Sequence, residues 1–368
     1  MSGTPTWRER FRTLHEQHGR KLDLAFFAGG FVFDVWAASA GADHAVVMIQ
    51  QVIYLSLIGG ILYLDFVRQA HPGALPMPAW IERVWRYRSL VLHFCLGTLM
   101  NLYSIFFLMS ASLSSSIVFV ALLFTAVILN ELQAVRRRGI DVKMALYVLC
   151  TFCLWSLIIP IVLHHVGTLT FLLSALATMG VIALLYDRLR RRIDRGIVLR
   201  RVVMPGLAMV GLLILLYQGG LIPPVPVAAK TLGVYHRVER SGDQFRLYRE
   251  PSRWRIWQSD DRVFVAEPGD VVHVFFAIYS PTDFADTVYV RWSVHDRTSG
   301  WHDSDRIPIR ITGGRAGGFR GTTTKQNYVA GRWRVTLETQ DGREIARRNF
   351  TISNGPTNPS RAFVVETY

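Results

Sequence analysis

The feature that most constrains this sequence is an apolar segment from Val202 to Val227, VVMPGLAMVGLLILLYQGGLIPPVPV, which ends in a cluster of prolines. Long apolar runs are frequent before this segment, whereas the residues after it are polar and rich in Arg and Asp. Hydrophobic residues make up 51% of the chain, too few for a protein built only of membrane spans. The segment therefore divides the chain into a membrane part and a part exposed to water.

Seven apolar runs are long enough to cross a bilayer, because a helix needs about 20 residues to span a hydrocarbon core of ~30 Å. They cover residues 22–40, 44–66, 89–110, 114–131, 144–163, 167–186 and 202–221. Residues 1–21 precede them, and there Trp7, Phe11 and Leu14 recur at helical spacing between charged residues. We expect a cytoplasmic amphipathic helix followed by an α-helical polytopic membrane domain over 22–222.

The charges of the connecting loops predict the orientation of these spans. The connections 67–88, 132–143 and 187–201 hold four, four and seven Lys or Arg residues, whereas the alternate connections hold none. Because basic loops stay in the cytoplasm, the N-terminus is expected inside and the C-terminal part outside. We interpret the protein as multi-pass in a bacterial inner membrane, with a periplasmic C-terminal domain. The net charge of +14 is then explained by topology, without a nucleic-acid partner.

Polar residues near the outer ends of the first two spans form the candidate membrane site, with the members Asp34, Gln50, Gln51 and His44. An ionisable group in hydrocarbon is costly and indicates function by default. One interpretation is an outward-facing polar cavity for a proton, an ion or a headgroup. The alternative is that Asp34 only bridges neighbouring helices.

The histidines and cysteines of the apolar half do not have the spacing of a metal or redox site. Cys150 and Cys153 lie within one apolar run, where packing is the simpler role. His164 and His165 are adjacent, so on a helix they would point about 100° apart, and an interfacial turn is the better interpretation. We expect no metal, no cofactor and no catalytic residue.

The chain after the last span has the pattern of a β domain. Residues 223–229 read as a Pro-rich tether, residues 230–354 as a β-sandwich and residues 355–368 as a C-terminal tail. Apolar and polar residues alternate in several short runs separated by turn signals, which predicts an immunoglobulin-like antiparallel sandwich of two sheets. The expected core residues are Trp292, Trp333, Phe276, Ile309 and Phe350, and the run from Gly269 to Ser280 is apolar on both faces, as in a central strand.

One part of this domain resembles a known family. The series WSVHD, Trp301, IPIRITGGRAGGFRGTTTKQNY, GRWRVTLETQDGR and NFTI is similar to a bacterial domain-of-unknown-function family. Its members typically follow the polytopic helices of a second uncharacterised family. The resemblance is strongest from Val271 to Ile352, and it implies no activity, cofactor or catalytic residue.

Basic residues on and between the predicted strands form a candidate binding face, with the members Arg310, Arg315, Arg320, Lys325, Arg332 and Arg334. Such a face could bind an anionic lipid headgroup, an envelope glycan or another envelope protein. The alternative is a solvated sheet face whose arginines pair with Asp303, Asp305 and Glu338. Trp254, Trp257 and Trp301 are possible sugar-stacking rings, although core or interface positions are commoner for tryptophan.

Three functional hypotheses follow. The first is a non-enzymatic membrane protein that presents a periplasmic β-sandwich to an envelope component or a partner protein. The second is a transporter or channel-like unit with its path near Asp34. The third, a membrane-embedded enzyme acting on a lipid-linked substrate, is least favoured, because no pair of acid–base groups or metal ligands converges at one depth.

Overall fold

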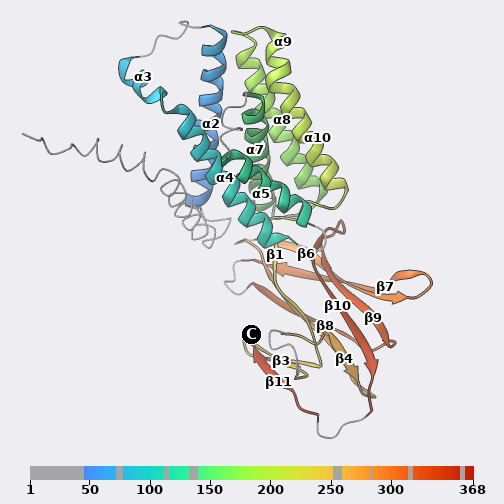
Figure 1. Ribbon diagram of the computed structural model, residues 1–368. Helices are drawn as coiled ribbons and strands as arrows, with labels where there is room; N and C mark the ends of the chain where they lie inside the picture. Colours follow the sequence, from blue (N-terminus) through green and yellow to red (C-terminus); the bar gives the residue numbers. More distant parts are fainter. Residues whose placement is uncertain are drawn as a thin grey trace, which may run out of the picture.

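The computed structural model describes residues 45–71, 78–111, 116–131, 140–251, 259–281, 284–313, 318–356 and 361–368. A bundle of helices stands on one side of the molecule and a β domain is packed against its end (Figure 1). The expected amphipathic helix over 1–21 and the expected first span over 22–40 lie outside the described residues.

Within the described residues, five helices of the bundle are long and apolar enough to cross a membrane. The bundle consists of α2 (Ala45–Ala70), α3 (Ala79–Trp85), α4 (Arg88–Ser110), α5 (Ile117–Glu131), α7 (Ile140–Leu163), α8 (Thr168–Leu189), α9 (Arg195–Val198), the π-turn η1 (Leu199–Val203) and α10 (Met204–Gln218). The last three form one continuous helix. The run expected over 114–131 corresponds to α5, whose apolar part is only Ile117–Ile128 and is shorter than the other five.

The side chains of these helices sort into a packed interior and an apolar exterior. Helix α7 lies at the centre, packs against α2, α4, α8 and α10, and buries Cys150 and Cys153 completely. Leucines and isoleucines such as Ile53, Leu176 and Leu215 are instead exposed on the bundle surface. Apolar side chains exposed in this way suit contact with lipid rather than water.

Helix α10 can approach α8 closely because residue 206 is glycine. A Cβ atom at Gly206 would lie 2.9 Å from Cδ1 of Ile182 and 3.4 Å from Cγ2 of Val148. The buried residues Val198, Val202, Gly206 and Val210 follow one another at a spacing of four. In an α-helix of 3.6 residues per turn, residues spaced by four rotate gradually around the helix axis. The wider π-turn at η1 compensates for part of this rotation.

Replacing Gly206 by leucine is therefore expected to destabilise the bundle by about 1–3 kcal/mol, because an overpacked side chain forces α10 away from α8. Gly211 lies on the same helix, and a Cβ atom there would meet nothing within 4 Å. Gly211→Leu is the matched control. Thermal unfolding of both variants in detergent measures the difference, and equal melting temperatures would contradict the close approach.

The described residues of the β domain form three sheets. The first has the order β1-β5-β8, the second β4-β10-β9-β6-β7 and the third β11-β3-β2. The strands are β1 (Ala228–Tyr235), β2 (Arg237–Ser241), β3 (Gln244–Arg249), β4 (Val263–Ala266), β5 (Val272–Tyr279), β6 (Ala285–Asp296), β7 (Gly300–Thr312), β8 (Phe319–Lys325), β9 (Gly331–Glu338), β10 (Glu344–Asn354) and β11 (Val364–Thr367). Strand β1 begins within the segment 223–229 that we expected to be a tether, so the connection to α10 is shorter than expected.

The first two sheets form an immunoglobulin-like sandwich. All their pairings are antiparallel except that of β4 with β10, and the β6–β7 hairpin forms the opposite edge of the five-stranded sheet. Trp292 on β6 is fully buried between the sheets, as is the characteristic tryptophan of this fold. The other expected core residues Trp333, Phe276 and Phe350 are buried with it, and Ile309 is half-buried against them.

The third sheet corrects two expectations. We expected two sheets and a C-terminal tail over 355–368, but β11 lies in that segment and pairs with β3. The third sheet covers the far face of β5, where Phe275 packs against Phe245 and Tyr368. Consecutive residues Phe275 and Phe276 of β5 are both fully buried, because β5 is covered by a sheet on each face.

Candidate functional site

The β domain contacts the end of the helical bundle through specific polar groups. Asp286, at the start of β6, accepts a hydrogen bond from the backbone N–H of Val166 at 2.9 Å. Its carboxylate also lies 3.2 Å from Nδ1 of His165. Both residues belong to the turn between α7 and α8, and the Val166 side chain is buried in the core of the β domain. This turn therefore belongs structurally to both parts of the molecule.

Asp341, in the turn between β9 and β10, makes the second contact. Its carboxylate accepts hydrogen bonds from Oγ1 of Thr168 at 2.7 Å, from the hydroxyl of Tyr217 at 3.2 Å and from Oγ1 of Thr339 at 2.5 Å. Burial opposes ionisation of Asp341, but these hydrogen bonds and the nearby Arg343 outweigh it, so its pKa lies below the usual value. The carboxylate is thus held charged between α8, α10 and the β domain.

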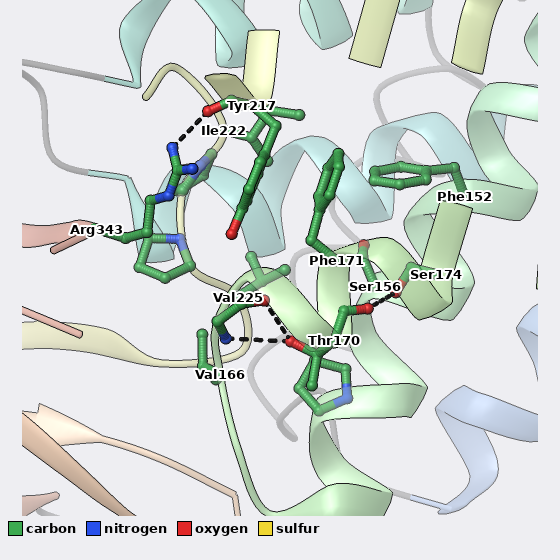
Figure 2. Close-up of a pocket in the computed structure, with 14 residues that line it drawn as sticks. Phe152, Ser156, Val166, Thr170, Phe171, Ser174, Tyr217, Ile222, Val225 and Arg343 are labelled. Carbon is green, nitrogen blue, oxygen red and sulfur yellow. Dashed lines mark hydrogen bonds between the residues drawn. The ribbon is translucent and has the colours of Figure 1, made fainter. Parts of the chain in front are cut away.

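Arg343, on the other side of the same turn, makes the third contact. Its guanidinium lies over the ring of Tyr217, 3.7 Å from the ring centroid, and donates to the Tyr217 backbone carbonyl (Figure 2). The other face of that ring stacks on Phe171 of α8, with centroids 3.7 Å apart. Tyr217 therefore links the last turn of α10 to both α8 and the β domain.

A cavity of about 30 Å³ lies at this contact, lined by Phe152, Ser156, Pro160, Val166, Gly167, Thr170, Phe171, Ser174, Tyr217, Ile222, Pro223, Pro224, Val225 and Arg343 (Figure 2). A volume of this size holds a water molecule and not an organic substrate. We call the contacts of Asp286, Asp341 and Arg343 with the helix ends the docking junction. Its geometry fixes the pose of the β domain on the bundle.

The second candidate site is the face of the five-stranded sheet that is turned away from β1, β5 and β8. It carries six arginines, which are Arg291, Arg306, Arg310, Arg332, Arg334 and Arg347. We call this surface the arginine face. Glu338 is buried beneath it and accepts from Nε of Arg291 at 2.9 Å and from Nε of Arg306 at 2.8 Å. A shallow hollow over these residues extends to Asp341, so the arginine face begins beside the docking junction.

The other end of the arginine face has cations without carboxylate partners. Arg334 lies 3.8 Å over the ring of Trp301 and donates to Oδ1 of Asn349, and Arg332 lies 5.8 Å from the same ring. Among the described residues, no carboxylate forms an ion pair with either arginine. Partial burial and the nearby Arg347 lower the pKa of Arg334. Trp301 therefore serves as a support for guanidinium groups, not as an open platform for sugars.

The six basic residues proposed from the sequence do not share one face. Arg310, Arg332 and Arg334 are on the arginine face, whereas Arg320 and Lys325 are on β8 in the other sheet. Arg320 donates to backbone carbonyls of Asp243 and Tyr368, and Lys325 pairs with Asp305. Arg315, Trp254 and Trp257 lie outside the described residues. Linear spacing could not assign β8 to the correct sheet, because that depends on how the sandwich closes.

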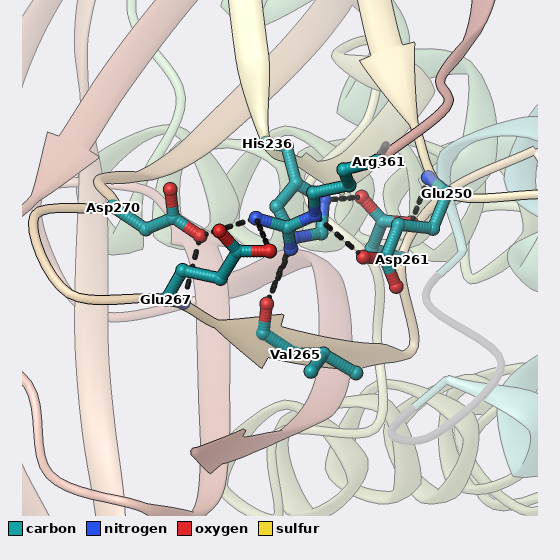
Figure 3. Close-up of polar contacts among 7 residues, drawn as sticks. All are labelled: His236, Glu250, Asp261, Val265, Glu267, Asp270 and Arg361. Carbon is teal, nitrogen blue, oxygen red and sulfur yellow. Dashed lines mark hydrogen bonds and ion pairs between the residues drawn. The ribbon is translucent and has the colours of Figure 1, made fainter. Parts of the chain in front are cut away.

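A third cluster ties the C-terminal strand to the domain (Figure 3). Arg361 pairs with Glu250 at 2.8 Å, with Asp270 at 2.6 Å and with Glu267 at 3.5 Å. Its guanidinium also meets His236 at 2.5 Å, and the other ring nitrogen of His236 bonds to Asp261 at 2.7 Å. The cluster sets Arg361 and His236 against four carboxylates, and each of these carboxylates contacts one of the two within the domain, so we assign the cluster a structural role.

The polar cluster expected in the membrane is only partly within the described residues. Asp34 and His44 lie outside them. Gln50 is half-buried and Gln51 is buried, and Oε1 of Gln51 has no hydrogen-bond partner among the residues that the structure describes. A cavity around Asp34 stays a prediction. Within the described residues, no group of three or more His, Cys, Asp or Glu side chains could hold a metal ion.

Sequence reasoning missed the residues of the docking junction. Asp286, Asp341 and Arg343 are single charged residues in or beside turns, with no motif around them. The short Pro-rich connection was the one available signal, because a short connection keeps the β domain close to the end of the last span.

Together the fold and the docking junction define a helical membrane protein with an immunoglobulin-like domain fixed to the end of its bundle. Residues 285–352 match the family described as "Protein of unknown function (DUF2914)". The β domain thus contains a segment that is similar to this family, and the resemblance to a domain-of-unknown-function family is confirmed. No curated protein matches the sequence.

Several solved structures are similar to the β domain. An immunoglobulin-like protein from Pseudomonas aeruginosa matches with 12% identity and a TM-score of 0.22, over 35% of this chain and 98% of that protein. A GH3 β-glucosidase from Bifidobacterium adolescentis matches with 12% identity and a TM-score of 0.20, over 39% of this chain and 20% of the enzyme. A β-glucosidase from Listeria innocua matches with 11% identity and a TM-score of 0.20, over 38% and 18%. The chain spans about a fifth of the length of these β-glucosidases.

Proposed function

We propose that this protein is a non-enzymatic inner-membrane protein that holds an immunoglobulin-like domain in a fixed pose at the periplasmic surface, where the domain binds a component of the cell envelope. The docking junction is the observation that carries this proposal. A flexible tether would be enough to anchor a domain, whereas three charged side chains and a stacked tyrosine also set its direction. A fixed orientation of the domain is useful when one particular face of the domain must contact a partner.

The distribution of charge supports the orientation. The arginines of the α8–α9 connection and of α3 lie at the end of the bundle away from the β domain, as Figure 1 shows for α3 and α9. Because basic segments stay in the cytoplasm, the β domain is on the opposite, periplasmic side. The arginine face is the part of that domain best suited to a partner, since polar arginine-rich surfaces with aromatic residues are common in interfaces.

Photo-crosslinking in living cells tests this proposal. A photoreactive residue is placed at Asn349, which is exposed on the arginine face, or at Thr324, which is exposed on β8 of the other sheet. We expect crosslinked adducts from position 349 and few from position 324, and we expect the adducts to weaken when the docking junction is broken. Equal adducts at the two positions, or none at position 349, would overturn the proposal.

A further inference from the structure

The arginine face changes its charge balance along its length. Near the docking junction, Arg291 and Arg306 share the buried carboxylate of Glu338, and Arg291 also pairs with Asp303 at 3.1 Å. At the far end, Arg332 and Arg334 have no carboxylate partner within the part of the chain that the structure describes. Arg310 is exposed opposite Thr287, near the bundle. The far end is thus the part of this face where two neighbouring arginines both lack a carboxylate partner among the described residues.

The guanidinium of Arg334 is also held in place. It lies over Trp301, whose ring meets His295 edge-on with centroids 5.0 Å apart, and its Nε is bonded to Asn349. A stacked guanidinium that uses only its Nε in a hydrogen bond to Asn349 keeps its other N–H groups available to a ligand. Such a fork suits the oxygens of a phosphate or a carboxylate better than a mobile lysine would.

From this arrangement we propose that Arg332 and Arg334, supported by Trp301, form a binding site for the phosphate or carboxylate groups of an extended anionic polymer. The inference rests on the proposed function and names the ligand class of the arginine face. A second arginine beside the fixed one allows two neighbouring anionic groups of one chain to be bound together.

The position of the site favours a polymer over a lipid headgroup. Asp286 contacts the bundle, and His295, which pairs with Trp301, lies nine residues further along β6. Nine residues of a strand cover about 30 Å. Of the cations nearer the bundle, Arg291 and Arg306 are already neutralised by Glu338 and Asp303, and Arg310 is a single exposed arginine that does not offer the two neighbouring guanidinium groups of the far end. The hairpin of β6 and β7 projects from the side of the sandwich (Figure 1), which leaves this end open to a chain in solution.

The test uses the full chain in nanodiscs of zwitterionic lipid, with a short linear polyphosphate as the probe and binding measured by titration calorimetry. We expect saturable binding that weakens with salt, and we expect Arg332→Ala with Arg334→Ala to lower the affinity at least tenfold. Arg240→Ala with Arg246→Ala is the matched control, because both residues are exposed on the third sheet and the charge change is the same. If the two double variants lost affinity equally, net charge alone would explain the loss and the proposed site would be wrong.

Two further arms separate the remaining outcomes. Arg334→Lys keeps the charge but not the planar fork, so we expect it to lose affinity as well, and wild-type affinity would contradict a positioned site. In nanodiscs of anionic lipid, unchanged polyphosphate binding supports the polymer. Competition by these lipids in the wild type but not in the Arg332/Arg334 variant would assign the site to a headgroup instead. Crosslinking at position 349 without polyphosphate binding would leave the proposed function standing and reject this ligand class.

Discussion

Replacing Asp341 and Arg343 together by alanine is expected to release the β domain from the bundle while leaving both parts folded. The change removes the acceptor of Thr168 and Tyr217 and the guanidinium stacked on Tyr217. Truncating such partly buried charged groups costs about 2–5 kcal/mol of contact free energy. Electron spin resonance distances between labels at Ser299→Cys and Arg195→Cys measure the release, since the native cysteines are buried. We expect one narrow distance distribution to become broad.

Asp303→Ala is the control for this prediction, because Asp303 is an exposed acid of the same domain that pairs with Arg291 and not with the bundle. Its distance distribution should stay narrow. A narrow distribution in the Asp341/Arg343 variant would mean that the apolar contacts around Val166 are enough to fix the pose.

Acid should weaken the same junction. The pKa of Asp341 is below its usual value when the domain is docked. The contribution of this carboxylate to the free energy of docking is therefore complete above the pKa of the undocked group, which is about 4. The contribution is lost as the pH falls through the lower, docked pKa. Because the ordinary pKa of an aspartate is about 4, the wild-type distance distribution should stay narrow between about pH 5 and pH 8 and broaden only below about pH 4.

The second large effect is expected at Arg361. Its side chain is 12% exposed, and Arg361→Ala leaves Glu250, Glu267 and Asp270 without their shared cation. Breaking a buried ion pair by removing one partner costs about 3–5 kcal/mol, and the partial exposure of the carboxylates places this case near the lower limit. Strand β11 should lose its attachment first, because Arg361 lies three residues before its first residue, Val364. Hydrogen exchange in β3 and β11, together with denaturant unfolding, measures the effect.

Arg237→Ala provides the comparison. Arg237 is 66% exposed and pairs with Glu239 on the surface of the same small sheet. Exposed pairs contribute about 0–1 kcal/mol, so this variant should unfold nearly as the wild type does. If Arg361→Ala is no more destabilising than Arg237→Ala, the cluster in Figure 3 does not hold the strand in place.

Local patterns in the sequence predicted the elements whose identity depends on short-range spacing. The apolar runs became five long helices and the shorter α5, and the alternating runs became the strands of the sandwich. Trp292 and Trp333 were placed in the core by period-2 alternation alone. These predictions succeed because burial of a helix or strand face is decided mainly by the residues of that element.

The candidate site was harder to predict. The sequence pointed to basic residues on β7, β8 and β9, but only the closed sandwich separates Arg320 and Lys325 from Arg332 and Arg334. The pattern also identified β5 as apolar on both faces without revealing what covers its second face. The answer is a sheet built from β2, β3 and the C-terminal strand β11, which lies more than 80 residues away along the chain.

The sequence by itself determined that an apolar half ends at the Val202–Val227 segment and that a sandwich follows, because hydrophobicity and its period are properties of neighbouring residues. The tertiary structure alone decided how the two halves meet. Asp341 and Thr168 are 173 residues apart, and Asp286 and Val166 are 120 apart. Contacts at such separations depend on how the chain closes its loops and sets its strand registers, and no local pattern records that outcome.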